Sequence, residues 1–309
     1  MTNKRITFVV NPNSANGLMG KEWPHIRSMA RDRLGSFETR ITTGPGDATR
    51  LAREAVVAGA DIVVCAGGDG TLNEVINGVM DEEGLCKPDL RLGLIPRGTG
   101  CDFIRTVPIP RDPDKALENI AAGHFRRIDL GRLIFRDHAG QTSWRYFHNV
   151  LSFGLGGEVD ERVNRTTRIF GGFVSFIWAT LISILLYDTK QIRLRVDDYF
   201  DEEVTSWNVA VANGQYHGGG MYVAPGASID DGLFQVTAIG DLSKPGIFWN
   251  LPRLYNGKIY EHNKIRKLIG RRIEASSQQR VLLDMDGEQP GQLPVIVDIV
   301  PSALPIICG

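Results

Sequence analysis

The stretch Ile62-Val63-Val64-Cys65-Ala66-Gly67-Gly68-Asp69-Gly70-Thr71-Leu72-Asn73-Glu74 decides the fold. Five apolar residues run directly into three glycines within four positions. Apolar residues at helical spacing follow, at Val75, Ile76 and Val79. This order predicts a strand, a tight turn and a helix. In a sheet built from such units, ligands bind at the turn that follows the strand.

The chemistry of this turn favours a phosphate group as the ligand. Glycines let backbone N–H groups approach a ligand closely, and the start of a helix adds unpaired donors and a partial positive charge. Thr71 and Glu74 also have the spacing of a capping box, in which each side chain satisfies an amide of the first helical turn. Capping and ligand binding both remain open for these two residues.

Composition and charge narrow the class of protein. The chain has 309 residues, 42% of them hydrophobic, which is enough for two domains with proper cores. A net charge of -1 argues against nucleic acid as the main partner. The four cysteines lack the spacing of a zinc site or a disulfide framework, so we expect a reduced, cytoplasmic chain. Met1–Asn11 is too short for a signal sequence and is interpreted as a first strand.

Strand and helix patterns alternate through the first part of the chain. Ile6–Val10 reads as a strand that ends in a loop of turn formers, Asn11–Gly17. This loop should lie beside the glycine turn if the two strands are parallel neighbours. A helix with an aspartate cap at its start is expected from Asp47, and a strand over Leu92–Ile95. The first part of the chain therefore predicts an α/β domain with a mainly parallel sheet.

The pattern changes after Asp129 to short segments rich in β-branched and aromatic residues, which predict an antiparallel second domain. The expected strands are Trp144–Phe153, Gln191–Val196, Val204–Ala212, Leu233–Ile239, Arg271–Ala275, Arg280–Met285 and Val295–Val300. One apolar helix, Phe173–Tyr187, interrupts them. It is short for a bilayer span, so it should be either core or the wall of a cleft for a lipid chain.

Four motifs, in order and spacing, resemble the diacylglycerol kinase catalytic family of soluble bacterial lipid kinases. The family is related to sphingosine and ceramide kinases and more distantly to NAD kinases. The motifs are Gly67–Gly78, Pro96–Phe103, Pro225–Phe234 and Asp286-Gly287-Glu288. The resemblance implies an N-terminal three-layer α/β domain and a C-terminal antiparallel β-sandwich-like domain. It places a nucleotide-binding domain at 1–130, completed by residues 300–309, and a lipid-substrate domain at 131–299.

The resemblance also implies ATP and Mg²⁺ as cofactors, with ATP in a cleft between the two domains and a lipid hydroxyl as the acceptor. Asp69 is then the strongest candidate for catalysis or nucleotide binding in the first domain, because a carboxylate that faces a triphosphate needs a metal ion or a ribose contact. The expected ATP contacts are Asn11, Pro12, Asn13, Ser14, Ala15, Thr42, Gly68, Asp69, Gly70, Thr71, Leu72, Asn73, Glu74 and Thr99.

Further carboxylates follow from the same resemblance. The catalytic base should be Asp286 or Glu288, between which the sequence does not choose, and Asp129 should relay to it. A structural Mg²⁺ is expected on Ser228, Asp231 and Leu233. Taken alone, each Asp-Gly pair in these motifs is also a hairpin signal, and Asp129 could be a simple turn residue.

Cys101 departs from the family, which usually has Asn at this position. The leading hypothesis is a kinase that phosphorylates a primary hydroxyl of a membrane lipid, with diacylglycerol as the first candidate, while it is peripherally associated with the membrane. A homodimer and a basic docking patch over Lys258–Arg272 are further expectations. The alternatives are an NAD kinase-like enzyme for a soluble metabolite, and a lipid- or nucleotide-binding protein without catalysis.

Overall fold

Strands that alternate with helices build a parallel sheet in the N-terminal part of the chain, as the sequence predicts. The computed structural model describes residues 4–165 and 182–309. The chain divides into unit 1, which is Met1–Asp129 with Pro301–Gly309, and unit 2, which is Leu130–Val300. The chain passes between the units within two long strands, β7 (Phe125–Asp137) and β18 (Gly291–Ile307).

The sheet of unit 1 has the strand order β2-β1-β3-β6-β18, and these neighbours pair in parallel. Its other strands are β1 (Ile6–Val10), β2 (Glu38–Ile41), β3 (Ile62–Gly67) and β6 (Arg91–Pro96). Every residue of β1 and β3 is buried. Continuous burial of this kind is expected for parallel strands that are covered on both faces.

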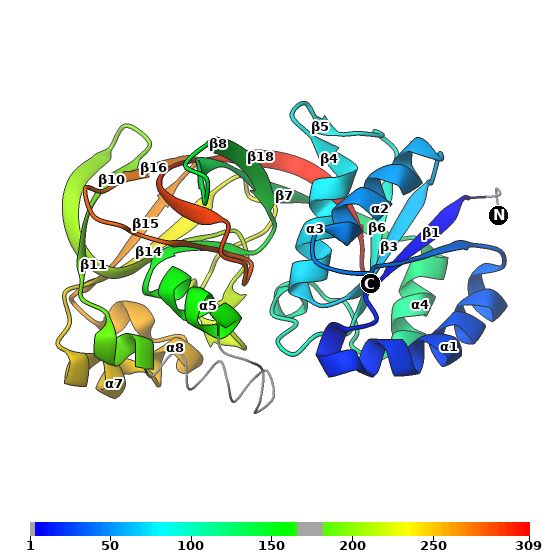
Figure 1. The fold of residues 1–309 in the computed structure, drawn as a ribbon, viewed down its shortest axis with the longest axis horizontal. Coiled ribbons are helices and arrows are strands. Elements are labelled where there is room, and N and C mark those ends of the chain that lie inside the picture. The colour runs from blue at the N-terminus through cyan, green and yellow to red at the C-terminus, as the bar shows by residue number, and fades with distance from the viewer. Residues whose placement is uncertain (1–3, 166–181) are drawn as a thin grey trace. The chain divides into compact units, whose positions relative to one another are not determined.

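Helices cover both faces of this sheet. They are α1 (Ser14–Leu34), α2 (Asp47–Val57), α3 (Asp69–Val79) and α4 (Pro113–Ala122). Figure 1 shows α1 with α4 on one face and α2 with α3 on the other. The short elements between them are β4 (Met80–Asp81), β5 (Gly84–Leu85) and the 3₁₀ helix η1 (Phe103–Arg105). The three layers confirm the predicted α/β class.

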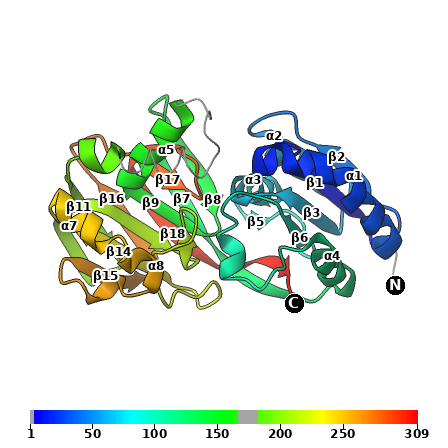
Figure 2. The same ribbon diagram turned by 90° about the horizontal axis from the view of Figure 1, so that it is seen from below.

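Unit 2 is built on antiparallel strands in the order β15-β14-β11-β10-β16-β18, with β9 between β11 and β17, and with β8 on β7. Figure 2 shows these strands from a second direction. The strands are β8 (Thr142–Phe147), β9 (Val150–Gly154), β10 (Lys190–Val196), β11 (Phe200–Ala212), β14 (Phe234–Gly240), β15 (Ile265–Gly270), β16 (Arg272–Ser276) and β17 (Leu283–Met285).

Strand β11 explains why unit 2 folds as a sandwich rather than as a flat sheet. Its first part, Phe200–Ser206, pairs with β10, whereas Asn208–Ala212 pairs with β9. The register with β14 shifts between Ser206 and Asn208, and a bulge of this kind bends a strand. The two ends of β11 thus serve different partners around one apolar core, which confirms the predicted sandwich-like class.

Short helices and a small hairpin complete unit 2. They are α5 (Leu155–Arg165), a helical turn at 182–186, α7 (Lys244–Asn250), α8 (Arg253–Asn256), the 3₁₀ helix η2 (Ile259–Glu261), β12 (Tyr216–His217) and β13 (Met221–Tyr222). Most of the expected helix Phe173–Tyr187 lies outside the described residues. Within the described ranges, every helix is too short or too polar to cross a bilayer.

The predicted strand Trp144–Phe153 is wrong as a single element. β8 ends at Phe147 and β9 begins at Val150, so the polar pair His148-Asn149 separates two strands. Strands β7 and β15 were not predicted. β15 carries Arg266 and Lys267 among its apolar residues, as edge strands often do. These charged residues interrupt the apolar pattern by which a strand is recognised in a sequence.

Close packing of α2 on α3 yields a test of the fold. A Cβ on Gly78 would lie 2.4 Å from the carbonyl oxygen of Thr49 and 2.7 Å from the Cβ of Ala52. We expect Gly78→Ala to lower the free energy of unfolding by about 1–3 kcal/mol, because the two helices must separate. Urea denaturation measures this loss. Gly44→Ala is the control, because nothing lies within 4 Å of that Cβ; an equal loss in both variants would contradict the packing.

Candidate active site

The glycine turn joins β3 to α3 at the carboxyl end of the parallel sheet. β3 ends at Gly67 and α3 begins at Asp69, with Gly68 in an extended conformation between them. A second loop touches this turn, since a Cβ on Gly98 would lie 2.6 Å from the Cα of Gly68. The amide of Arg97 also donates to the carbonyl of Gly67 at 2.7 Å. Glycine at both positions therefore lets two backbones meet.

The loop after β1 lies against the same turn, as predicted from the parallel arrangement. The amide of Asn11 donates to the carbonyl of Ala66 at 3.0 Å, and its side-chain Nδ2 donates to Thr71 Oγ1 at 2.9 Å. The hydroxyl of Ser14 lies 3.5 Å from the same oxygen. Ala15, Asn16 and Gly17 then adopt left-handed backbone angles before the regular part of α1. The structure thus brings Asn11, Ser14 and Thr71 together.

The capping-box interpretation of Thr71 and Glu74 is wrong. Gly68 precedes α3 without any side-chain cap. The carboxylate of Glu74 instead accepts hydrogen bonds from the amides of Gly46 (2.8 Å) and Ala48 (3.0 Å) at the start of α2. Asp47, the expected cap of α2, is its first residue. Glu74 therefore ties α3 to the positive end of α2, where a carboxylate is stabilised.

Asp69 holds the loop that follows β6. Its Oδ2 accepts the amide of Asp102 at 3.0 Å, and its Oδ1 lies 3.4 Å from the donating amide of Phe103. The carboxylate thus joins the glycine turn to η1. Of the other expected ATP contacts, Thr42 is buried and Thr99 is exposed.

The Asp286 carboxylate is a buried acceptor in unit 2. It is 5% exposed and accepts three consecutive backbone amides, those of His148 (3.0 Å), Asn149 (3.1 Å) and Val150 (2.9 Å). The ring nitrogen Nδ1 of His148 lies 2.7 Å from Asp286 Oδ2. Sequence reasoning missed His148; the signal for it was the polar pair that interrupts the apolar run of β8 and β9. A carboxylate held by several N–H donors is stabilised in its charged form.

A second buried carboxylate, Asp284, supports the same turn. Its Oδ1 accepts the amide of Gly287 at 3.1 Å. Its Oδ2 lies 2.7 Å from Nε2 of His217 and accepts the hydroxyl of Ser152 at 3.3 Å. Sequence reasoning placed neither His217 nor Asp284 in the site, although Asp284 stands inside an apolar strand. An acidic residue inside an apolar strand was the available sequence signal for this site, because a buried carboxylate needs hydrogen-bond partners.

Glu288 is the more accessible of the two expected bases. Its side chain is 34% exposed and lies 3.4 Å from Nη1 of Arg145. Its backbone is fixed, because its amide donates to the carbonyl of Met285 and its carbonyl accepts the amide of Met285. The hairpin therefore buries one carboxylate, that of Asp286, and leaves the carboxylate of Glu288 partly exposed.

Asp129 lies at the edge of unit 1. It is buried, and its Oδ1 accepts the amide of Ser302 at 2.7 Å. Ser302 has a left-handed backbone angle, φ 52°. The observed role of Asp129 is thus to hold the chain where β18 enters unit 1. Its expected relay to a base remains a prediction.

The loop expected to hold a structural Mg²⁺ is a tight turn in unit 2. The amide of Leu233 donates to Oδ1 of Asp231 at 3.0 Å, and the hydroxyl of Ser228 donates to Asp230 at 2.8 Å. Gly232 between them is left-handed, with φ 72°. In the part of the chain that the structure describes, no group of three or more His, Cys, Asp or Glu could hold a metal. A site here would therefore depend on one carboxylate with backbone oxygens, a donor set that suits Mg²⁺.

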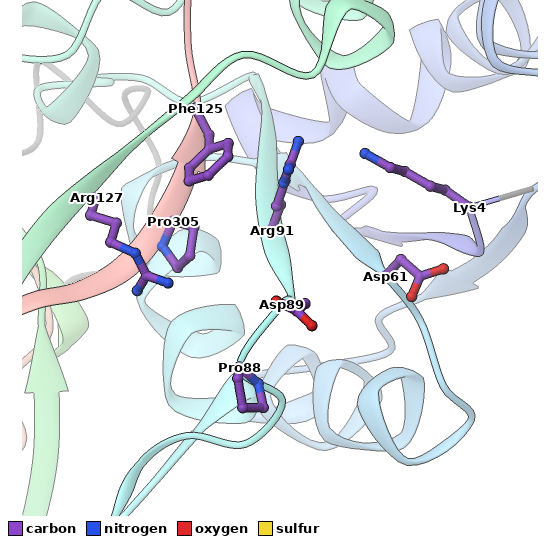
Figure 3. Close-up of a pocket in the computed structure, with 8 residues that line it drawn as sticks. All are labelled: Lys4, Asp61, Pro88, Asp89, Arg91, Phe125, Arg127 and Pro305. Carbon is purple, nitrogen blue, oxygen red and sulfur yellow. The ribbon is translucent and has the colours of Figure 1, made fainter. Parts of the chain in front are cut away.

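A cavity of about 360 Å³ lies elsewhere in unit 1 (Figure 3). Lys4, Asp61 and Arg91 line it, and each stands at or just before the start of a parallel strand. The cavity is thus at the amino edge of the sheet, away from the glycine turn. Its charges have partners within the fold: Asp61 lies 2.6 Å from Lys87 Nζ, and Arg91 stacks on Phe125. It is not the nucleotide site that the motifs predict.

Comparison with known proteins assigns the family. The diacylglycerol kinase catalytic domain matches residues 5–133, and the YegS C-terminal NAD kinase beta sandwich-like domain matches residues 149–308. A diacylglycerol kinase of Staphylococcus saprophyticus is 30% identical over 299 residues, which cover 94% of this chain and 91% of the relative. The chain belongs to the diacylglycerol kinase family. Membership in this kinase family identifies the chain as an enzyme.

Other members of the diacylglycerol kinase family match over nearly the whole chain. A diacylglycerol kinase of Staphylococcus aureus is 31% identical over 300 residues, 94% of this chain and 88% of its own. A putative diacylglycerol kinase from Bacillus anthracis shares the fold, with a TM-score of 0.77 at 21% identity over 99% of this chain and 97% of its own. Yeast NADH kinase has a TM-score of 0.51 at 14% identity, covering 99% and 83% of the two chains, and this shows fold likeness alone.

The backbone at Cys101 suits the Asn that the family resemblance implies at this position, and it does not explain the Cys found here. Cys101 has φ 48°, in the left-handed region, where Asn is enriched and most side chains are strained. Its thiol is buried, and burial together with the nearby charge of Asp69 raises the pKa of Cys101 to about 11. The thiol is therefore a neutral packing group, and the family residue would suit this backbone better.

Cys101→Asn tests this backbone preference. We expect Cys101→Asn to lower the free energy of unfolding less than the same change at Cys65, because relief of the left-handed backbone offsets part of the cost of burying the amide. The same change at Cys65, which is fully buried inside β3, should cost about 2 kcal/mol or more, because the amide would lack partners. Chemical denaturation of both variants measures the difference. Equal losses would show that backbone angle does not decide the preference at position 101.

Proposed function

We propose that the chain is an ATP- and Mg²⁺-dependent lipid kinase that transfers the γ-phosphate to the primary hydroxyl of diacylglycerol, forming phosphatidic acid. The observation that carries this proposal is the glycine turn clamped between two loops at the carboxyl ends of β1, β3 and β6. Open parallel sheets bind ligands at this edge. The choice of diacylglycerol as the lipid substrate comes from the named relatives, since each is a diacylglycerol kinase.

Unit 1 supplies the nucleotide half of the proposal. The positive end of the α3 dipole, together with backbone amides of the glycine turn, would bind the phosphates of ATP. The contacts proposed are those of the loop Asn11–Ala15, of Thr42, of Gly68–Glu74 and of Thr99. Asp69 already accepts two backbone amides, so we propose that its first task is to hold the turn against η1.

Unit 2 supplies the acceptor half. Because three amides and the His148 ring surround Asp286, we propose that Asp286 positions the hairpin and that Glu288 is the base. The lipid hydroxyl oxygen attacks the γ-phosphorus and its proton passes to the Glu288 carboxylate, while the bond from that phosphorus to the bridging oxygen of ADP breaks. Asp129 would act at a distance, through the chain that it holds at Ser302.

Magnesium enters this proposal at two places. Bound to the phosphates, it would neutralise charge that develops during transfer. The Ser228, Asp231 and Leu233 loop offers oxygen donors only, which fits Mg²⁺, and an ion there would brace the loop. We also propose that the enzyme works from the cytoplasm at a membrane surface, where its lipid substrate resides, and that it forms a homodimer.

A phosphate-transfer assay tests the reaction. Purified protein with labelled ATP and Mg²⁺ should transfer phosphate to diacylglycerol in mixed micelles, and addition of EDTA should abolish the transfer. A parallel reaction offers NAD as the acceptor without detergent. Transfer to NAD alone would replace the proposal with an NAD kinase, and ATP binding without transfer to any acceptor would leave only a binding protein.

Paired variants test the base. Glu288→Gln should lower kcat about a hundredfold with little change in Tm, because the side chain is partly exposed and would lose its proton-accepting role. Asp286→Asn should lower the free energy of unfolding by about 2 kcal/mol or more, because an amide cannot match three N–H donors. Kinetics and thermal melting separate the two effects.

Glu261→Gln is the matched control, because Glu261 also lies 3.4 Å from an arginine, Arg253, on the surface of unit 2. Its kcat and Tm should both stay close to those of the parent. If Glu288→Gln keeps normal turnover while folded Asp286→Asn loses it, the base is Asp286 and the assignment above is wrong.

A further inference from the structure

Apolar side chains are exposed on one part of unit 2. Trp249, on α7, is 85% exposed, the highest value among the large apolar residues that the structure describes. Leu185, Leu186 and Tyr255 are each more than half exposed. We call these four side chains, Leu185, Leu186, Trp249 and Tyr255, the aromatic surface. Exposed apolar side chains on neighbouring elements are typical of an interaction site.

The elements that carry the aromatic surface are fixed to the fold. Nζ of Lys244, the first residue of α7, donates to the carbonyl of Leu185 at 2.7 Å. On the inner side of α7, Ile247 packs against a buried cluster that includes Trp207. Figures 1 and 2 both show α7 and α8 close together at one end of unit 2. Trp249 is therefore held outward by a packed helix rather than exposed by a frayed one.

The segment that carries Trp249 and Tyr255 has more basic than acidic residues. Between positions 244 and 267 the sequence has six basic residues and one acidic residue, Glu261. Part of this charge is balanced locally. Arg253 and Lys258 lie near Glu261, Arg266 lies near Glu202, and Nζ of Lys244 lies 3.4 Å from Asp188. The earlier idea of a patch made of basic residues alone is thus too simple. The excess still favours an anionic partner.

Tryptophan and tyrosine have a specific preference for the boundary between lipid head groups and acyl chains, and basic residues favour anionic lipids. We infer that the aromatic surface docks on an anionic lipid bilayer, with Trp249 in the head-group region and the basic residues of 244–267 over the lipid charge. This inference rests on the proposed function, since a kinase for a bilayer lipid must reach its acceptor there. A protein partner would need a pocket shaped to receive Trp249, whereas a bilayer needs none.

Vesicle binding tests the inference without using catalysis. The full chain should co-sediment with phosphatidylglycerol vesicles and bind phosphatidylcholine vesicles more weakly, and its tryptophan fluorescence should shift to the blue on binding. Trp249→Ala should weaken binding about tenfold and reduce the shift, because an indole leaves the interface. Val57→Ala is the matched control, since Val57 is 81% exposed in unit 1. Equal affinity of the two variants overturns the inference.

A charge variant tests the anionic preference. Lys258→Gln should weaken binding to phosphatidylglycerol vesicles about fivefold and leave the weak phosphatidylcholine binding unchanged. Lys115→Gln, an exposed lysine in unit 1, should match the parent. Sedimentation without vesicles tests whether the aromatic surface binds a second copy of the chain instead. If Trp249→Ala abolishes a dimer and leaves the affinity for vesicles unchanged, the surface joins two copies of the chain and the inference is wrong.

Activity measurements keep this inference apart from the proposed function. With a short-chain diacylglycerol dissolved as monomers, Trp249→Ala should retain the parent rate, whereas with diacylglycerol in anionic vesicles its rate should fall about tenfold at low vesicle concentration. Failure of the parent to phosphorylate either form overturns the proposed function, while vesicle binding still decides the docking surface. Equal loss on both forms would overturn docking as the role of Trp249.

Discussion

The buried carboxylate of Asp286 is the interaction on which unit 2 depends. Burying a charge costs several kcal/mol unless donors surround it, and here three backbone amides at the start of β9 provide them. The same segment extends the network, because Asn149 donates to the carbonyl of Tyr216 and Asn213 donates to the carbonyl of His148. Segments far apart in sequence are therefore stable only when they assemble together.

Local patterns in the sequence predicted what local forces determine. The strand, turn and helix around Gly67–Glu74 follow from apolar spacing and glycine, and the contact of the Asn11 loop with that turn follows from parallel pairing. Most strands of unit 2 were also recognisable, because β-branched runs between turns have few other uses. The family resemblance, carried by ordered motifs, predicted the fold class of both units, and the two family models that match the chain confirm that class.

Nonlocal partners limited what the sequence could show of the site. Glu74 had the spacing to cap its own helix, but α2 begins at a glycine cap without a side chain, and the carboxylate serves that helix instead. Asp286 and Glu288 are equivalent acids in sequence, and only burial against β9 separates them. His148, between β8 and β9, and Asp284, inside β17, were missed for the same reason, since a polar residue in an apolar run does not reveal its distant partner.

Strand β18 runs from unit 2 into unit 1, where Ile306 pairs with Leu92 and Ile307 joins the core under α1. The residues that complete the parallel sheet are thus synthesised after the whole of unit 2. During translation, this edge of β6 has no strand to pair with until β18 has been synthesised. Unit 1 therefore cannot reach its final form on the ribosome ahead of unit 2, and the order of synthesis couples the maturation of the two halves of this kinase.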